Sequence, residues 1–211
     1  MYHLSSLKQV GLFITFEGIE GCGKTTQIKL LAPWLKERGH SVCVTYEPGG
    51  TLLGQEIRKI LLSPNFSPAK ETELLLYLAE RAEHVEKVIR PGLEESKIVL
   101  CDRYHDSTLA YQGYGRGLEF EWVNNLFKQL KWPKPDLTFL LDCPVEVGFK
   151  RLRGRSLDRI EGEKMAFHQR VREGFLSLAQ MEPERIKVID ATQSIENIQI
   201  QIREWIKQYG L

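Results

Sequence analysis

The stretch that decides the fold is FEGIEGCGKTTQ, residues 16–27. Within it, residues 18–25 fit the pattern G-x-x-x-x-G-K-[ST] of a phosphate-binding loop without a mismatch. An apolar run precedes the loop and a helical pattern follows it, which is the context that the motif requires. Glycines let backbone amides converge on phosphate oxygens, and the helix N-terminus adds positive potential. The sequence therefore predicts an ATP-binding loop made of Gly18, Ile19, Glu20, Gly21, Cys22, Gly23, Lys24, Thr25 and Thr26.

Two side chains of this loop carry specific expectations. Lys24 should reach the β- and γ-phosphates of ATP and act in catalysis, and Thr25 should be a ligand of Mg²⁺. The loop alone does not name a function, because GTPases share it. However, the guanine-reading motif NKxD of GTPases is missing from the sequence. A small domain with further basic residues after its strands instead suggests a kinase of small phosphorylated metabolites.

The remaining pattern predicts the fold around this loop. Five apolar, β-branched runs recur along the chain, and each is followed by an amphipathic helical pattern; the runs cover residues 12–17, 41–46, 97–101, 137–142 and 186–190. Continuous apolar runs are typical of strands buried on both faces, as in parallel sheets. Helices are expected over residues 24–38, 71–90, 119–130 and 195–208. The alternation predicts a doubly wound α/β P-loop fold with a five-stranded parallel sheet and helices on both faces.

Length and composition bound the function classes. The 211 residues suit one domain, expected over 12–211 after an N-terminal extension over 1–11. The formal charge of +1 argues against nucleic acid as the main partner. No stretch approaches the roughly 20 apolar residues of a membrane span, and the first residues lack a signal-peptide pattern, so we expect no membrane partner and a cytoplasmic location. The four cysteines form no CxxC pair, which disfavours a zinc site.

The segment CDRYHDSTLAYQGYGRG, residues 101–117, follows the third predicted strand. Ligands of such sheets bind beyond the carboxyl ends of the strands. Asp102 lies where a carboxylate could hold Mg²⁺ opposite Thr25. Arg103 should aim its guanidinium into the cleft and clamp phosphate oxygens. The alternative is a purely structural Asp102–Arg103 pair at the end of a strand.

A second group of residues follows the second strand. In the sequence EPGGT, Pro48 keeps Glu47 extended, and Arg58 follows on the next helix. Arg81 interrupts an apolar helical stripe that includes Tyr77, and it has no carboxylate three or four residues away. A surface stem with its charge in water is the ordinary explanation. The alternative is a nucleobase stacked on Tyr77 and hydrogen-bonded by Arg81.

A basic segment follows the fourth strand. Arginines cluster around Gly154, at positions Arg151, Arg153, Arg155 and Arg159. Such a run is usually a solvated surface. At this edge of the sheet it could also form a lid, at about residues 151–163, that closes over the triphosphate and excludes water.

Taken together, these segments resemble thymidylate kinases. FEGIEGCGKTTQ, EPGGT, AERAEHV, CDRYHDSTLAYQGYGRG and LDRIE occur in the order and spacing of that family, from about residue 12 to the C-terminus. The combination of DRY with AYQG is specific, whereas the phosphate-binding loop alone is not. The resemblance implies a nucleoside monophosphate kinase fold that transfers the γ-phosphate of ATP to dTMP. The product would be dTDP, for dTTP synthesis, with Mg²⁺ as the cofactor.

The resemblance also implies residue roles. Glu20 would contact the acceptor sugar, Arg58 and Arg103 would clamp the dTMP phosphate, and Arg81 would read thymine. The further contacts to the nucleoside would come from Glu47, Tyr77, Thr108, Tyr111 and Gln112, of which Tyr111 would block a ribose 2′-hydroxyl. Arg151 would lie beside adenine, opposite the loop over 191–194. Because the loop has Gly21 where one subgroup has a basic residue, the catalytic cation is expected from the lid, with Arg153 and Arg155 as candidates. Family members are commonly homodimers, so a homodimer is expected.

Two alternatives remain open on the sequence. A deoxynucleoside kinase would use a carboxylate such as Glu47 as a base on a 5′-hydroxyl, but Arg58 and Arg103 would then lack an acceptor phosphate. A nucleotide-binding regulatory module without turnover would not need Lys24, Thr25 and the lid arginines.

Overall fold

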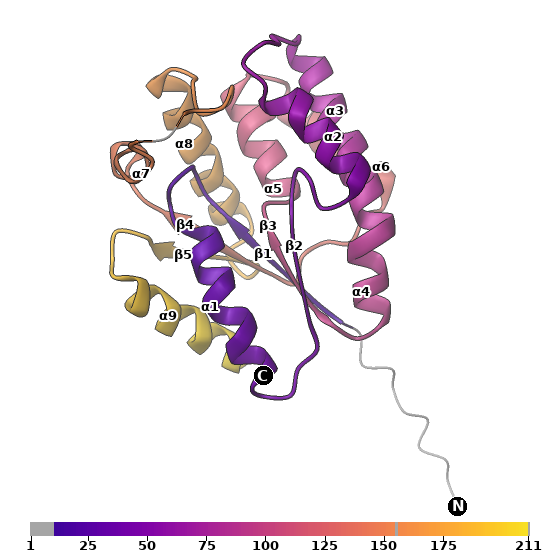
Figure 1. Ribbon diagram of the computed structural model, residues 1–211, viewed down its shortest axis with the longest axis vertical. Coiled ribbons are helices and arrows are strands. Elements are labelled where there is room, and N and C mark those ends of the chain that lie inside the picture. The colour runs from indigo at the N-terminus through magenta and orange to yellow at the C-terminus, as the bar shows by residue number, and fades with distance from the viewer. Residues whose placement is uncertain (1–10, 155, 211) are drawn as a thin grey trace, which may run out of the picture.

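The computed structural model describes residues 11–154 and 156–210 (Figure 1). Residues 1–10 of the expected extension and Arg155 of the expected lid lie outside the described residues. Gly11 already joins the folded domain, since its amide donates to the carbonyl of Leu93 at 3.1 Å.

The core of the molecule is a five-stranded parallel sheet with the order β2-β3-β1-β4-β5. Its strands are β1 (Leu12–Glu17), β2 (Val42–Tyr46), β3 (Ile98–Asp102), β4 (Leu137–Asp142) and β5 (Ile186–Asp190). β1 is central and almost wholly buried, as its apolar sequence predicts. The five strands confirm the predicted runs, with ends that differ by at most one residue. Asp102 belongs to β3 itself because its carbonyl pairs with the amide of Glu47 at 3.0 Å.

Helices cover both faces of the sheet (Figure 1). They are α1 (Lys24–Lys36), α2 (Leu52–Leu62), α3 (Lys70–His84), the π-helix η1 (Val85–Ile89), α4 (Arg90–Glu94), α5 (His105–Thr108), the π-helix η2 (Leu109–Gly115), α6 (Phe120–Leu130), α7 (Val145–Arg151), α8 (Met165–Met181) and α9 (Ile195–Gln208). Successive side chains of β1 go to opposite layers. Phe13 packs with Val85 and Ile89, whereas Ile14 belongs to the larger core cluster with Leu31 of α1.

The loop of residues 18–23 follows β1, the central strand, from which the order of the strands extends in both directions. From β1 the sheet grows through β3 and β2 on one side and through β4 and β5 on the other. A crevice forms at such a point beyond the carboxyl ends of the strands. The doubly wound fold therefore puts the ends of β1, β2 and β3 around one space.

Two elements differ in detail from the sequence expectation. The helix expected over 71–90 is interrupted, because α3 ends at His84 and continues as η1 and α4. The lid has no regular helix in its described part, since residues 152–154 and 156–164 contain only turns and irregular backbone. None of the helices in the described ranges has the length and apolar character needed to cross a membrane.

Candidate active site

The loop of residues 18–23 needs its glycines. Gly18, Gly21 and Gly23 have φ values of 134°, 72° and 101°, which disfavour other residues. A Cβ on Gly21 would also lie 2.2 Å from the carbonyl oxygen of Gly148. Inside the loop, Lys24 Nζ donates to the carbonyls of Gly18 at 3.0 Å and Ile19 at 2.9 Å. The ammonium of Lys24 is thus held at the centre of the loop, where phosphates are expected to bind.

A cavity of about 1000 Å³ opens over this loop. Its walls include all loop positions from Glu20 to Thr26, together with Asp102, Arg103, Arg151 and the segment around Ala191. The Arg151 guanidinium donates to the carbonyls of Ala191 at 2.8 Å and Gly21 at 3.2 Å. The structure thereby brings Arg151 beside the 191–194 loop, as the sequence predicts. The volume of this cavity is sufficient for a nucleoside triphosphate.

The two residues expected at the metal lie in direct contact. Thr25 Oγ1 donates to Asp102 Oδ2 at 2.5 Å, at the mouth of the loop. Hydroxyl and carboxylate oxygens are ligands that Mg²⁺ accepts, and Mg²⁺ usually takes one or two protein oxygens together with phosphates and water. Residues 11–154 and 156–210 contain no cluster of three or more His, Cys, Asp or Glu that could hold a metal ion. The donor set at Thr25 and Asp102 therefore suits a nucleotide-bound Mg²⁺ and not a protein-enclosed metal.

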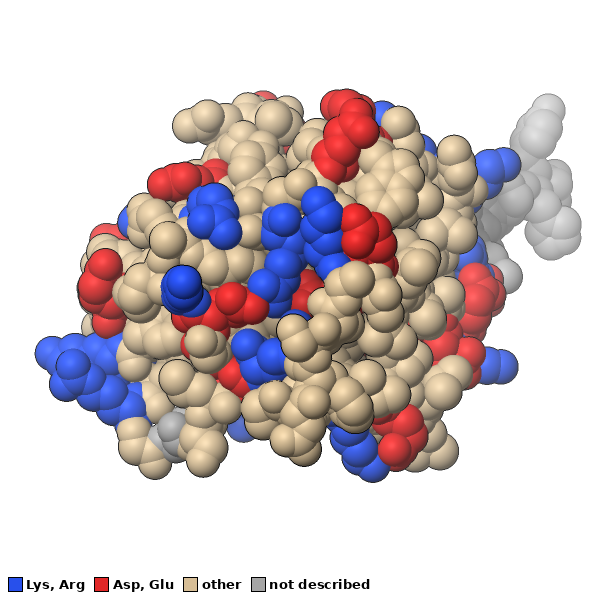
Figure 2. Space-filling view, turned by 90° about the horizontal axis from the view of Figure 1, so that it is seen from above, with Lys and Arg blue, Asp and Glu red and all other residues tan. Residues whose placement is uncertain are grey.

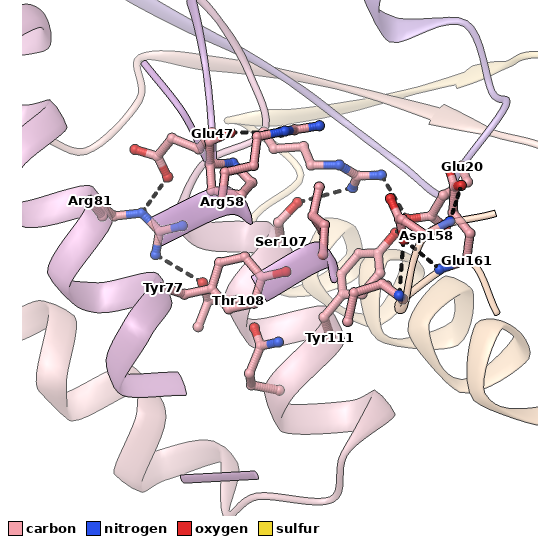
Figure 3. Close-up of a pocket in the computed structure, with 15 residues that line it drawn as sticks. Glu20, Glu47, Arg58, Tyr77, Arg81, Ser107, Thr108, Tyr111, Asp158 and Glu161 are labelled. Atoms are coloured by element: carbon pink, nitrogen blue, oxygen red, sulfur yellow. Dashed lines mark hydrogen bonds and ion pairs between the residues drawn. The ribbon is translucent and has the colours of Figure 1, made fainter. Parts of the chain in front are cut away.

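A second cavity, of about 130 Å³, is lined by all nine residues expected at the acceptor (Figure 3). These residues are Glu20, Glu47, Arg58, Tyr77, Arg81, Arg103, Thr108, Tyr111 and Gln112. In Figure 3, Arg81 and Glu47 lie at one end, and Glu20 and Tyr111 lie at the other. The segments that supply these side chains are distant in sequence, so only the fold brings them together.

Arg81 is a buried cation that uses three of its five N–H groups within the protein. It is 2% exposed, and its Nε donates to Glu47 Oε2 at 2.6 Å. Its two terminal nitrogens donate to Thr108 Oγ1 at 2.9 Å and to the carbonyl of Tyr104 at 3.1 Å. Burial would raise the pKa of Glu47, but Arg81 and a hydrogen bond from His84 hold it below its ordinary value. Arg81 has no acidic partner on its own helix, and its charge is instead balanced by Glu47, which is 34 residues away in the sequence.

The opposite end of the acceptor cavity is built on Glu20. Its Oε1 accepts hydrogen bonds from Arg103 at 3.1 Å and from the Tyr111 hydroxyl at 2.5 Å. Although burial alone would raise the pKa of Glu20, the Arg103 cation lowers it to about 2, and His168 Nδ1 lies 3.6 Å from Glu20 Oε2. Arg103 has φ of 71°, a conformation that few non-glycine residues adopt. Its amide donates to the carbonyl of Phe16 at 3.0 Å, which fixes Arg103 to the end of β1.

Arg58, Tyr77 and Gln112 complete the expected set. Arg58 donates to the carbonyl of Pro48 at 2.6 Å and lines both cavities. Tyr77 is half-buried in the cavity wall. The Gln112 amide donates to Glu73 Oε1 at 2.9 Å, so its carbonyl oxygen is oriented by Glu73.

Sequence reasoning missed several residues that support the site. Glu73 also binds Arg116 and Arg159, at 3.0 Å and 2.7 Å, and thereby ties the lid to α3. Glu17 accepts from the Tyr104 amide and the Ser107 hydroxyl, at 2.8 Å and 2.6 Å. Burial raises the pKa of Glu17 to about 8. A carboxylate inside an apolar run was the available signal for Glu17, whereas nothing local distinguishes Glu73 from a surface glutamate.

The lid arginines have different positions. Arg153 is exposed and lines neither cavity, while Arg155 lies outside the described residues. Arg159 faces inward and donates to the carbonyl of Leu61 at 2.7 Å. The catalytic roles of Arg153 and Arg155 therefore stay predictions.

The two cavities meet. Six residues line both of them: Glu20, Glu47, Arg58, Arg103, Asp158 and Glu161. Seen from above, basic side chains gather around a hollow with acidic side chains beside them (Figure 2). A donor over the phosphate-binding loop and an acceptor in the smaller cavity would thus face each other across Arg103 and Glu20.

Comparisons with known proteins agree with this geometry. A family model described as thymidylate kinase matches residues 16–202. A thymidylate kinase of Geotalea uraniireducens is 50% identical over 204 residues, covering 92% of this chain and 95% of the relative. One of Geobacter sulfurreducens is 53% identical over 196 residues, covering 89% and 92%. The crystal structure of thymidylate kinase from Ehrlichia chaffeensis matches with a TM-score of 0.77 and 38% identity, covering 94% of this chain and 99% of that one. This chain belongs to the thymidylate kinase family.

Proposed function

We propose that the protein is an ATP-dependent kinase that transfers the γ-phosphate of ATP to dTMP and gives dTDP, in dTTP synthesis. ATP binds in the larger cavity over the loop of residues 18–26, and dTMP binds in the smaller one. The observation that carries this assignment is the shared wall of the two cavities. Glu20, Arg58 and Arg103 line both, so an acceptor phosphate held there faces the donor phosphates.

The chemistry is in-line phosphoryl transfer. The phosphate of dTMP is already an anionic nucleophile, so the site needs no strong general base. Catalysis then rests on positioning and on neutralisation of charge. Lys24 supplies one cation from the centre of the loop, and Arg103 supplies another from the end of β3. Arg153 and Arg155 are the candidates for a third, delivered by the lid.

Thr25 and Asp102 would hold Mg²⁺ and its waters. When bound with ATP, Mg²⁺ neutralises and orients the β- and γ-phosphates. The 2.5 Å contact between the Thr25 hydroxyl and the Asp102 carboxylate supports this pair, because both oxygens already point to one place.

Recognition of the acceptor uses both ends of the smaller cavity. Arg81 and Thr108 form a polar pair at the thymine end, with Tyr77 as the stacking surface. Tyr111 and Glu20 meet at the proposed sugar end, where the Tyr111 ring would block a 2′-hydroxyl. This arrangement favours a deoxynucleotide with a base edge that Arg81 can bind.

The deoxynucleoside kinase alternative is disfavoured by the surroundings of Glu47. Both oxygens of this carboxylate are occupied, by Arg81 at 2.6 Å and by His84 at 2.8 Å. Arg81 also holds the pKa of Glu47 low against the effect of burial, which weakens Glu47 as a base. Arg58 and Arg103, in contrast, supply the cations that an acceptor phosphate needs.

We further propose a cytoplasmic homodimer that pairs through α2, α3 and α6. Apolar side chains of these helices are exposed on the outer surface, notably Leu52 at 84%, Leu75 at 59% and Trp122 at 40%. A second copy would cover such a surface. Light scattering after size exclusion should give twice the mass of the 24.4 kDa chain. The variant Leu75→Glu, which places a charge on this surface, should be monomeric. A monomeric wild type would contradict the dimer.

The activity is tested by ADP release with Mg-ATP and one of four acceptor conditions: dTMP, dUMP, thymidine or none. Release with dTMP well above the other three is the expected result. Release with thymidine but not dTMP would instead favour the deoxynucleoside kinase and make Glu47 the base. Absence of turnover with every acceptor would favour the regulatory module.

A further inference from the structure

A third cavity, of about 310 Å³, lies outside the active site. It is formed by the start of α5, one face of α6 and the segment over 131–134, and we call it the α6 pocket. None of its lining residues lines either of the two substrate cavities. Its volume falls in the range of small-molecule sites.

Aromatic rings form the walls of the α6 pocket. The ring centroids of Phe127 and Trp132 are 6.0 Å apart with the planes tilted by 52°. His105 meets Phe127 at 5.6 Å and Tyr104 at 5.4 Å, both edge to face. A flat ring is the ligand that such walls accommodate best, through stacking and edge contacts.

The mouth of the α6 pocket is positively charged. Its lining contains three exposed lysines and one carboxylate. The carboxylate, Glu182, is neutralised by Lys134 at 2.6 Å and by Arg185 at 2.8 Å. Lys128 and Lys131 form no ion pair with a described residue, so both remain available for an anionic group. The ligand therefore combines a flat ring with a negative charge.

Two buried polar atoms of the walls have no hydrogen-bond partner among the described residues, Tyr104 Oη and His105 Nδ1. Burial lowers the pKa of His105 to about 4, against the opposing effect of Asp106, so the ring is neutral at pH 7. His105 Nε2 lies 3.3 Å from Asp106 Oδ1. Tyr104 Oη and His105 Nδ1 are both enclosed by protein and are not open to the pocket, so the wall contacts a bound ring through its ring surfaces and not through these two atoms.

From these features we propose that the α6 pocket binds a flat aromatic anion at a site separate from both substrate sites. The ring lies against Phe127 and Trp132, and the negative group lies on Lys128 and Lys131. The α6 pocket and the active site are lined by different residues, and binding at the pocket is measured by fluorescence and not by turnover. Either assignment can therefore fail without the other.

Binding is tested with the fluorescent nucleotide 2-aminopurine 2′-deoxyriboside 5′-monophosphate, whose emission falls when its base stacks on aromatic rings. Arg81 contacts the back of this pocket, since its guanidinium carbon lies 5.2 Å from the ring centroid of Tyr104. The titration therefore uses the full chain with dTMP, Mg²⁺ and AMP-PNP at saturation, so that the active site is filled. The double variant Lys128→Glu/Lys131→Glu removes the anion contact, and Lys207→Glu on α9 is the matched control for the loss of exposed charge.

We expect saturable quenching by the wild type and by the control. The double variant, and the uncharged 2-aminopurine 2′-deoxyriboside on the wild type, should each bind at least about tenfold more weakly, the cost of a lost charge-assisted contact. Unchanged dTMP turnover by the double variant would show that it is folded. The proposal is overturned if quenching is not saturable with the active site filled. It is equally overturned if the double variant binds like the control, or if removal of the phosphate leaves the affinity unchanged.

Discussion

The carboxylate of Glu20 and the guanidinium of Arg103 lie 3.1 Å apart at the junction of the two substrate cavities. One comes from the phosphate-binding loop and the other from the residue after β3, 83 positions along the chain. Because the pKa of Glu20 is lowered to about 2, the pair is ionised throughout the physiological range. It holds Arg103 at the place where we propose that the donor and acceptor phosphates meet.

Arg103→Ala should therefore lower activity, and it should also cost some unfolding free energy because Glu20 loses its counter-charge. Removal of a group that stabilises transition-state charge costs about 10²–10³ in kcat. Steady-state kinetics with dTMP, together with denaturant unfolding, checks this expectation. Arg90→Ala, which removes an exposed arginine paired with Glu86, is the matched control and should behave like wild type. A folded Arg103→Ala protein with wild-type turnover would remove Arg103 from the mechanism.

The buried pair of Arg81 and Glu47 predicts a large effect on stability. Glu47→Gln leaves the Arg81 cation buried without its counter-charge, which costs about 3–5 kcal/mol of unfolding free energy. Glu86→Gln, at the exposed pair with Arg90, should cost no more than about 1 kcal/mol. Urea unfolding of both variants gives the comparison. Equal losses would mean that solvent screens the Arg81–Glu47 pair as it does a surface pair.

The fold and the site differ in how far the sequence determines them. The five strands follow from local apolar runs, because burial on both faces favours apolar residues at most positions of β1 and β4. The phosphate-binding loop is likewise local, since Gly18 to Thr25 are contiguous. The partner of Arg81 is not, because the pair with Glu47 depends on how α3 packs beside the end of β2. The change from α3 to the π-helix η1 after His84 does have a local signal, Pro91, which follows η1 closely and lacks the amide of a regular helical hydrogen bond.

Glu80 predicts a particular dependence of stability on pH. Burial and the neighbouring Glu47 raise the pKa of Glu80 from 4.5 to about 7, and Oε1 accepts from the Gly49 amide at 2.8 Å. The proton of Glu80 stabilises the fold fully below pH 4.5, and this stabilisation is lost as the pH rises towards 7. Glu80→Gln removes the titration but keeps an oxygen for Gly49. The stability of this variant relative to wild type should rise between pH 4.5 and 7 by on the order of 3 kcal/mol.

Unfolding free energies at several pH values test this, and the difference between the two proteins isolates Glu80 from the other buried carboxylates. Glu71→Gln, at an exposed position of α3, is the control for the loss of a carboxylate from the same helix. A flat difference for Glu80→Gln would mean that the pKa of Glu80 is not raised by folding.

We expect only one of the two lid arginines, Arg153 or Arg155, to supply the catalytic cation. Alanine at the position that delivers the catalytic cation should lower kcat by about 10³ or more while leaving stability unchanged. Alanine at the other position should have a small effect. Single-turnover rates of Arg153→Ala and Arg155→Ala decide between them. Wild-type rates in both variants, and in the double variant, would show that the cation comes from elsewhere.

The most direct test of the account is the balance between ADP and dTDP formed from Mg-ATP and dTMP by the purified protein. Transfer to dTMP across the Glu20–Arg103 junction predicts one dTDP for each ADP, with little ADP when dTMP is left out. ADP without matching dTDP would mean that water or another acceptor takes the phosphate, and it would contradict the assignment of the smaller cavity to dTMP.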